Sequence, residues 1–176
     1  DVLLSFVGTD EHDHQGVKSL IERWKRLPGK VMVAKPVLEE FSRHAYIAQY
    51  EWQQVYPHHI PGNQETRSRL MRNVFVRSFG RMIEEKKARA RDWSGYIQTY
   101  RGSAEYDYQK AIQTLRLDSK IEELPPIGQG EEALEREVRK FLISRIDESW
   151  GPKLYARDKA RRDAQLYAAI VHFTRM

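Results

Sequence analysis

The sequence of 176 residues contains no cysteine. Disulfide bridges, thiolate zinc sites, iron–sulfur clusters and cysteine nucleophiles are therefore excluded. Long apolar runs are also missing, because the longest, over residues 2–7, contains Ser5 and falls far short of the ~18 residues that span a bilayer. We expect no membrane span. Because small secreted domains often use disulfides, the missing cysteines favour an intracellular location, in the cytoplasm or an organellar matrix.

Several enzyme motifs are absent as well. The sequence has no G-x-x-x-x-G-K-[ST], no G-x-G-x-x-G, no H-E-x-x-H and no G-x-S-x-G. Gly128-Gln129-Gly130 is a lone G-x-G, and the acidic residues that follow it would repel a phosphate. These absences favour a protein that is not an enzyme, and we expect no cofactor.

What the sequence has in abundance is charge. Charged residues make up 31% of the chain and apolar residues 40%, with a mean hydropathy of −0.72. The net charge is +5, which permits binding to nucleic acid or another acidic surface without requiring it. This balance is typical of helices with narrow apolar stripes, or of a subunit whose remaining contacts lie on a partner protein.

Apolar residues recur every three or four positions between proline and glycine stops, which predicts amphipathic helices. We predict helices over residues 16–27, 36–56, 64–93, 104–124, 131–150 and 153–173. Pro36 suits a first helical turn, and Asn63 can cap the third helix. The first helix carries the stripe Val17, Leu20, Ile21, Trp24 and Leu27.

The predicted fold class is therefore all-α, an irregular bundle of about five or six helices in a single domain over 1–176. Residues 31–34 form a short apolar linker that suits an extended conformation. If the chain has two subdomains, the boundary falls at 125–130, where two prolines and two glycines gather.

The N-terminal stretch DVLLSFVGT, residues 1–9, is short, apolar and β-prone, which predicts a short extended segment. It resembles the opening strand and loop of nucleotide-sensing Rossmann-like domains, such as the CRISPR-associated CARF family. Such a domain would continue with alternating strands and helices, and the sequence after Thr9 does not alternate in this way. No function is carried over from these nine residues.

Clusters of cations are the first candidate site, since phosphate recognition needs cations on one surface. The candidate nucleic-acid-binding residues are Lys86, Lys87, Arg89, Arg91, Lys153, Arg157, Arg161 and Arg162. Trp93, Tyr96 and Tyr100 follow the first four and offer rings for base stacking. The competing interpretation is an ordinary charged helix face, in which acids such as Glu85 and Asp158 pair with these cations.

The second candidate site is the segment Asp10-Glu11-His12-Asp13-His14. His12 and His14 could bind a transition metal, with a further ligand from His44, His58 or His59. The competing interpretation is a solvated acidic loop.

Three functions remain open at this level. The first is a non-catalytic interaction or scaffolding subunit of a larger assembly with protein partners, such as a ribonucleoprotein. The second is a module that binds RNA or DNA through basic helix faces, and the third is a metal-dependent enzyme built on His12 and His14. Trp24, Trp52, Trp93 and Trp150 lie on separate predicted helices, where core packing is the default role and a protein interface the alternative.

Overall fold

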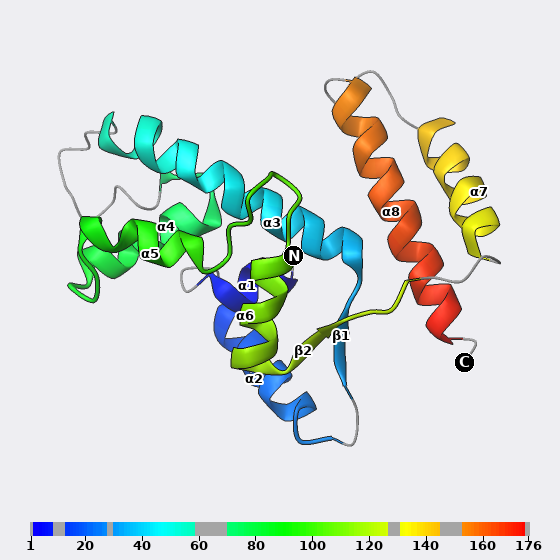
Figure 1. Cartoon of the computed structure of the whole chain (residues 1–176), viewed down its shortest axis with the longest axis horizontal. Coiled ribbons are helices and arrows are strands. Elements are labelled where there is room, and N and C mark those ends of the chain that lie inside the picture. The colour runs from blue at the N-terminus through cyan, green and yellow to red at the C-terminus, as the bar shows by residue number, and fades with distance from the viewer. Residues whose placement is uncertain are drawn as a thin grey trace. The chain divides into compact units, whose positions relative to one another are not determined.

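The computed structural model describes residues 2–8, 13–27, 30–58, 70–126, 131–144 and 153–174. Within these ranges the chain is predominantly helical, which confirms the predicted fold class (Figure 1). The described helices are α1 Val2–Val7, α2 His14–Trp24, α3 Lys35–Tyr50, α4 Val74–Glu84, α5 Trp93–Gln98, α6 Gln109–Ser119, α7 Glu131–Ser144 and α8 Lys153–Thr174. Two short parallel strands, β1 (Val31–Val33) and β2 (Ile121–Glu123), pair with each other.

The chain divides into two compact units. The first comprises Asp1–Val31 and Leu38–Glu122, and the second comprises Met32–Val37 and Glu123–Met176. The backbone passes between the units inside both strands and in the first turn of α3. The boundary expected at 125–130 includes residues outside the described ranges, and it stays a prediction.

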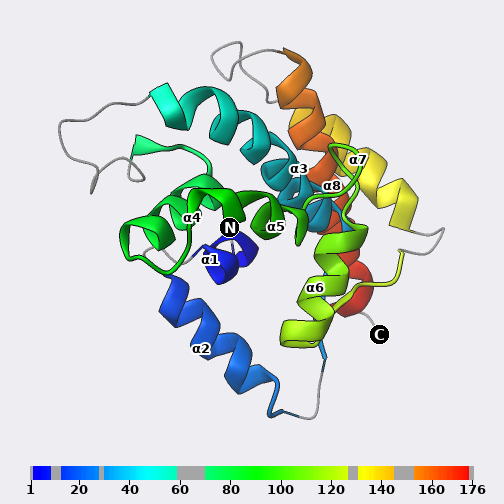
Figure 2. The ribbon, with the colours of Figure 1, turned by 60° about the vertical axis from the view of Figure 1, so that its left-hand side comes forward.

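The core of the first unit is built around α3. Its buried apolar residues in this unit recur at helical spacing, and they are Leu38, Phe41, Ala45 and Ala48, with Ser42 buried beside them. The strongly amphipathic α4 and the short α5 lie along α3, as both ribbon views show (Figures 1 and 2). Phe41 contacts Phe75 of α4 edge to face, with ring centroids 5.4 Å apart.

The prediction of an extended N-terminal segment is wrong, because residues 2–7 form α1. Short apolar runs suit either a strand or a buried helix, and periodicity alone does not separate them. Here α1 packs against α2, Leu3 is buried, and the carbonyl of Leu4 accepts the Gly8 amide at 2.7 Å. The resemblance to a Rossmann-like opening strand therefore finds no strand in the described part of this segment.

The continuous helix predicted over 64–93 is correct only in part, because helix α4 covers the middle of the described range and not the whole of it. Residues 70–73 form a turn, α4 runs only from Val74 to Glu84, and a single turn of 3-10 helix (Ala90–Asp92) precedes α5. Asn73 starts α4, because its side-chain oxygen accepts the Phe75 amide at 2.9 Å. The expected cap Asn63 lies outside the described residues.

Helix α4 stops where Lys86 adopts a left-handed conformation with φ of 58°. The amides of Lys86 and Lys87 then donate to the carbonyls of Ile83 and Met82, at 2.9 and 2.8 Å. This is the hydrogen-bond pattern of a Schellman motif, which satisfies the last carbonyls of a helix. Helix α4 therefore ends at Glu84, nine residues before the predicted end at 93.

The helix predicted over 104–124 is shorter, since α6 covers Gln109–Ser119 and β2 follows it. Lys120, with φ of 53°, ends α6 in the left-handed region. The predicted extended linker at 31–34 contains β1, and the helix predicted over 153–173 corresponds to α8. The helix predicted over 16–27 corresponds to α2, which begins two residues earlier at His14 and ends three residues earlier at Trp24. Of the helix predicted over 131–150, residues 131–144 form α7 and 145–150 lie outside the described ranges.

The helix predicted over 36–56 changes its geometry after Tyr50. Residues Glu51–Val55 form a π-helical turn, and Tyr56–His58 follow as 3-10 helix. The Glu51 carboxylate accepts the backbone amides of Arg72 and Asn73, with the shorter bond at 2.8 Å. The turn thereby ties the end of α3 to the start of α4.

The second unit contains α7 and α8, which pack along each other. His172 near the end of α8 lies 3.0 Å from the Glu131 carboxylate at the start of α7, so the two helices are antiparallel. Alanines at four-residue spacing on α8 are buried, namely Ala160, Ala164 and Ala168. Small side chains at this spacing permit close helix packing.

Candidate functional site

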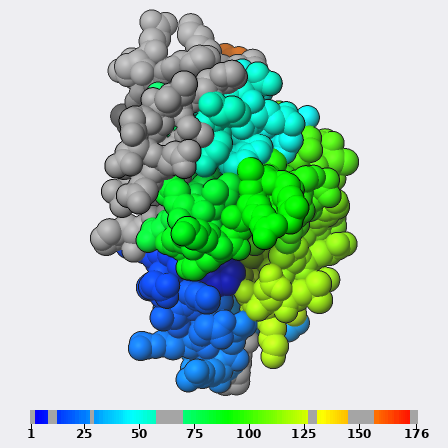
Figure 3. Space-filling model, turned by 90° about the vertical axis from the view of Figure 1, so that its left-hand side faces the viewer, coloured from blue at the N-terminus to red at the C-terminus, as the bar shows by residue number. Residues whose placement is uncertain are grey.

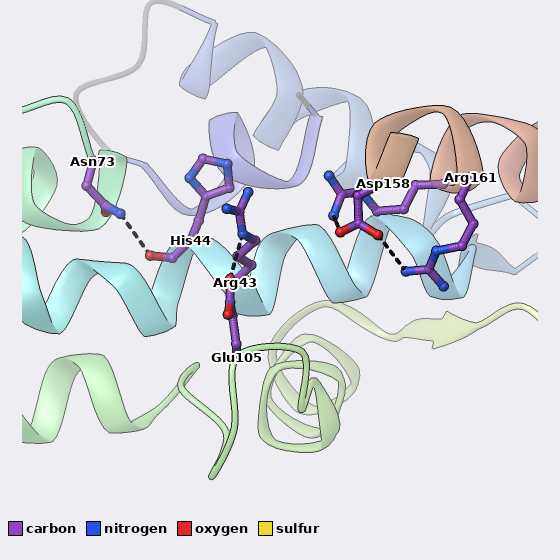
Figure 4. A network of polar contacts seen from close by, with 7 residues as sticks. Arg43, His44, Asn73, Glu105, Asp158 and Arg161 are labelled. Carbon is purple, nitrogen blue, oxygen red and sulfur yellow. Dashed lines mark hydrogen bonds and ion pairs between the residues drawn. The ribbon is translucent and has the colours of Figure 1, made fainter. Parts of the chain in front are cut away.

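The close-up view of Figure 4 shows polar contacts within the first unit and around Asp158 of α8 in the second. Arg43 of α3 donates to Glu105 at 2.7 Å, and the Asn73 amide group donates to the His44 carbonyl at 2.8 Å. In the second unit Asp158 pairs with Arg161 at 3.6 Å. The first two contacts join separate segments of the first unit, whereas the third lies within α8 between residues three apart.

Aromatic rings form a continuous cluster inside the first unit. Each ring contacts at least one other at centroid distances from 4.4 to 6.0 Å. The members are Phe41, Trp52, Tyr56, Phe75, Phe79, Trp93, Tyr96 and Tyr100. Trp93 is only 3% exposed and its indole N–H donates to Gln49 at 2.8 Å. Burial of Trp93 removes it as a base-stacking partner.

The first predicted basic cluster lies on the segment that joins α4 to α5. Lys86, Lys87, Arg89 and Arg91 are all exposed. Lys87 pairs with Glu85 at 2.7 Å, and Arg91 lies 3.9 Å from Asp92. Lys86 and Arg89 form no ion pair with a described residue. The segment therefore holds two unpaired cations and two that are paired locally.

The second predicted basic cluster, on α8, is more strongly neutralised. Arg161 and Arg162 both approach Asp158, at 3.6 and 3.7 Å. Arg162 is only 4% exposed, so it is not part of an accessible cationic surface. Arg157 is exposed, and the side chain of Lys153 lies outside the described residues. The structure thus places these four residues on α8, where Arg162 is buried and Arg161 lies close to Asp158.

The predicted histidine pair is divided. His12 lies outside the described residues, and His14 is buried at the start of α2. Its Nδ1 is 2.9 Å from the Ser5 carbonyl oxygen, and because a carbonyl only accepts, Nδ1 carries the proton and donates. Across the described ranges, no group of three or more His, Asp or Glu side chains is placed to hold a metal ion. His14 therefore acts as a tie between α1 and α2.

An exposed apolar surface on α2 was not anticipated as a site. Leu20, Trp24 and Leu27 are 42%, 46% and 60% exposed, and we call these three residues the α2 apolar face. Leu20 and Trp24 are four residues apart on one side of α2, and Leu27 follows three residues later in the turn after the helix. Ile21 and His14 point instead into the first unit, where both are buried. Figure 3 shows the α2 segment, in blue, at the surface beside α4 and α5.

Positive charge surrounds the α2 apolar face. The sequence from 14 to 30 contains Lys18, Arg23, Lys25, Arg26 and Lys30 against the single acid Glu22. Lys25 donates to the Glu22 carboxylate at 2.8 Å, and this bond lowers the pKa of Glu22. The charges of Lys25, Arg26 and Lys18 act in the same direction. The only acid on this stretch is therefore already paired.

The sequence carried no separate signal for this surface. The spacing of Val17, Leu20, Ile21 and Trp24 is i, i+3, i+4 and i+7, which is the ordinary pattern of a helix face that packs on a core. The structure divides the stripe between the interior and the solvent. Periodicity alone predicts the helix and leaves open which half is buried.

Comparisons with protein-family models, curated proteins and solved structures found no match to this chain. Any functional proposal therefore depends on its own surface chemistry. Among the described helices, none combines the length and apolar character needed to cross a bilayer.

Proposed function

We propose that this protein is a non-catalytic interaction subunit of a larger assembly, and that it docks on a protein partner through the α2 apolar face. The observation that carries the proposal is the joint exposure of Leu20 and Trp24 on one face of α2 and of Leu27 in the turn that follows it. Isolated exposed apolar residues need no explanation, but a contiguous group with a polar rim is typical of an interaction site. Tryptophan and arginine are also the residues most enriched at interface hot spots.

Folding does not account for this exposure. The same helix has an inward side, on which His14 and Ile21 are buried, so α2 already has its anchor to the fold. A tryptophan that is half exposed loses much of the hydrophobic stabilisation that full burial would give. Binding of a partner would bury the remaining apolar surface.

The test is the size of the native assembly. The tagged chain, expressed in its own cells, should sediment well above its 20.8 kDa mass in a sucrose gradient. Replacing Leu20 and Trp24 by Ser should shift it towards the monomer. Tyr50→Gln is the matched control, because Tyr50 is 67% exposed at the end of α3 in the same unit. A wild-type chain that sediments as a lone monomer would contradict the proposal.

Nucleic-acid binding is the second proposal, and it is favoured by the unpaired cations Lys86 and Arg89 between α4 and α5. Lys86 keeps a cation at a left-handed position where glycine is usual, which fits a role outside folding. RNA or DNA affinity should fall steeply with salt, and Lys86→Glu with Arg89→Glu should weaken it. Charge reversal at the paired Lys159 of α8 is the control, since its ammonium already lies 2.8 Å from Asp163. No binding at low salt would refute this proposal.

A further inference from the structure

We propose that the α2 apolar face binds an amphipathic helix of a partner protein whose flanking side chains are acidic. This inference rests on the proposed function and adds the chemistry of the partner. It depends on three features of α2, which are the spacing of its apolar residues, an unneeded glycine and its charge.

The spacing favours a helical occupant. Gly16, Leu20 and Arg23 on the exposed side of α2 follow the alternating four- and three-residue steps of a heptad seam, and Leu27 adds an apolar side chain in the turn after the helix. Such a seam packs along a second helix with its side chains fitted between those of the partner. Trp24 lies beside the seam and gives it a large apolar anchor.

Gly16 has no structural role inside the chain. A Cβ atom at this position would meet nothing within 4 Å, so no neighbour requires a glycine. Glycine inside a helix costs about 1 kcal/mol relative to alanine. Because Gly16 lies one turn before Leu20 on the same side of α2, its missing side chain leaves room for close approach of a partner backbone.

The positive charge around the α2 apolar face determines the charge that the partner helix should carry. Lys18, Arg23 and Arg26 are exposed and form no ion pair with a described residue. A second copy of α2 would bring like charges together, which costs several kcal/mol at an interface and disfavours self-association. A helix flanked by Glu or Asp would neutralise these cations as it covers the apolar face.

An anionic membrane surface would match the charge but not the shape. Interfacial helices present a long apolar face that enters the acyl boundary. Here the face consists of three side chains, and the apolar α1 packs against α2 with Leu3 buried. The bare surface at Gly16 also gains nothing from lipid, whereas it suits a neighbouring helix.

The first experiment uses the full chain and three synthetic helical peptides of about three heptads each. The first has a leucine seam with glutamate flanks, the second the same seam with lysine flanks, and the third glutamate flanks with serine in the seam. Fluorescence anisotropy should give micromolar binding of the first peptide and at least about tenfold weaker binding of the other two. Equal affinity for the glutamate and lysine peptides, or no binding of the first at ~1 mM, would overturn the inference.

Substitutions in and around the α2 apolar face test whether the first peptide binds at this surface. Trp24→Ser and Leu20→Ser should each weaken the first peptide about tenfold, while Tyr50→Gln should leave it unchanged. Gly16→Gln should raise the melting temperature, because the helix gains a better helix former, yet it should weaken binding by blocking the approach. If Gly16→Gln binds as well as the wild type, close helix packing at this position is refuted.

Binding to lipid vesicles tests the remaining alternative, in which the α2 apolar face binds an anionic membrane. Vesicles of phosphatidylglycerol with phosphatidylcholine should not retain the chain at physiological salt. Retention that Trp24→Ser abolishes would overturn the inference in favour of a membrane. If the peptides fail while the native assembly still depends on Leu20 and Trp24, the acidic-helix chemistry is wrong and the proposed function stands. If the native chain is a lone monomer, the proposed function fails independently.

Discussion

The indole of Trp52 lies almost parallel to the indole of Trp93, with centroids 4.6 Å apart and an interplanar angle of 15°. Trp52 also stacks with Tyr56 at 4.4 Å and meets Phe79 edge to face at 5.3 Å. Trp52 reaches these rings from the π-helical turn after α3, where each turn holds more residues than an α-helix. The turn therefore joins the end of α3 to α4 and α5 through stacked rings.

This arrangement predicts unequal effects of two tryptophan substitutions. Trp93→Ala should destabilise the first unit by about 3–5 kcal/mol, because it empties a buried ring site between Trp52 and Phe79. Trp24→Ala should destabilise it clearly less, since Trp24 is already 46% exposed and its replacement leaves no closed cavity. Urea unfolding followed by near-ultraviolet circular dichroism measures both. Equal effects of the two substitutions would contradict the ring packing described here.

Much of the fold was predictable because it depends on local rules. Apolar spacing gave α2, the α-helical part of α3 and α8, and proline and glycine stops separated most elements. Segment 70–98 was not predictable in this way, because α4 begins and ends through contacts that only the fold provides. Glu51 binds the turn before α4 from 21 residues away along the chain, and the left-handed Lys86 carries no sequence signature such as glycine.

The candidate sites show the same division between local and tertiary information. Sequence clusters of lysine and arginine say nothing about pairing, so Arg162 counted as a surface cation although it is buried. The α2 stripe predicted a helix but not its orientation, because Ile21 and Leu20 are equally apolar and only tertiary packing selects which is covered. Apolar residues of a binding surface are therefore hard to distinguish from core residues in a single sequence.

Two glycines give the next prediction. A Cβ at Gly102 would overlap the Asp107 carbonyl oxygen, which the Ser42 hydroxyl also holds at 2.7 Å, while a Cβ at Gly95 would meet nothing. Gly102→Ala should therefore destabilise the first unit by about 3 kcal/mol or more. Gly95→Ala, inside α5, should stabilise it by about 0.5–1 kcal/mol. Thermal unfolding of the two variants should move in opposite directions, and a shift of the same sign in both would argue against this loop geometry.

The left-handed Lys86 gives a prediction of increased stability. A non-glycine residue in this conformation costs about 1–2 kcal/mol, and glycine avoids most of that cost. Lys86→Gly should therefore raise the free energy of unfolding by about 0.5–1 kcal/mol. Arg89→Gly is the control, because Arg89 is extended with φ of −117° and glycine there should only add flexibility to the unfolded chain. A loss of stability in Lys86→Gly would show that its side chain stabilises the turn.

Asp107 makes the stability of the first unit depend on pH. Its carboxylate accepts the Ser103 hydroxyl at 2.7 Å, the Ser103 amide at 2.8 Å and the Gln109 amide at 3.2 Å. The hydroxyl bond is the largest cause that lowers the pKa of Asp107 below its ordinary value of 3.8, and the two amides add to it. A lowered pKa in the folded state means that this stabilisation is complete above the ordinary pKa. The stabilisation is lost as pH falls from the ordinary pKa of Asp107 to its lower pKa in the folded protein.

Asp107→Asn isolates this contribution. At neutral pH the variant should be less stable by about 0.5–1 kcal/mol, in the lower part of the range for such caps because the carboxylate is open to water. Below the ordinary pKa of 3.8 the difference should shrink, because a protonated Asp107 accepts hydrogen bonds much as asparagine does. Glu22 and Glu85 also have lowered pKa values, but both are retained in the variant, so their effects cancel in the difference. Urea unfolding of both proteins across the acidic range measures it, and a difference that stays constant would exclude titration of Asp107 as the cause.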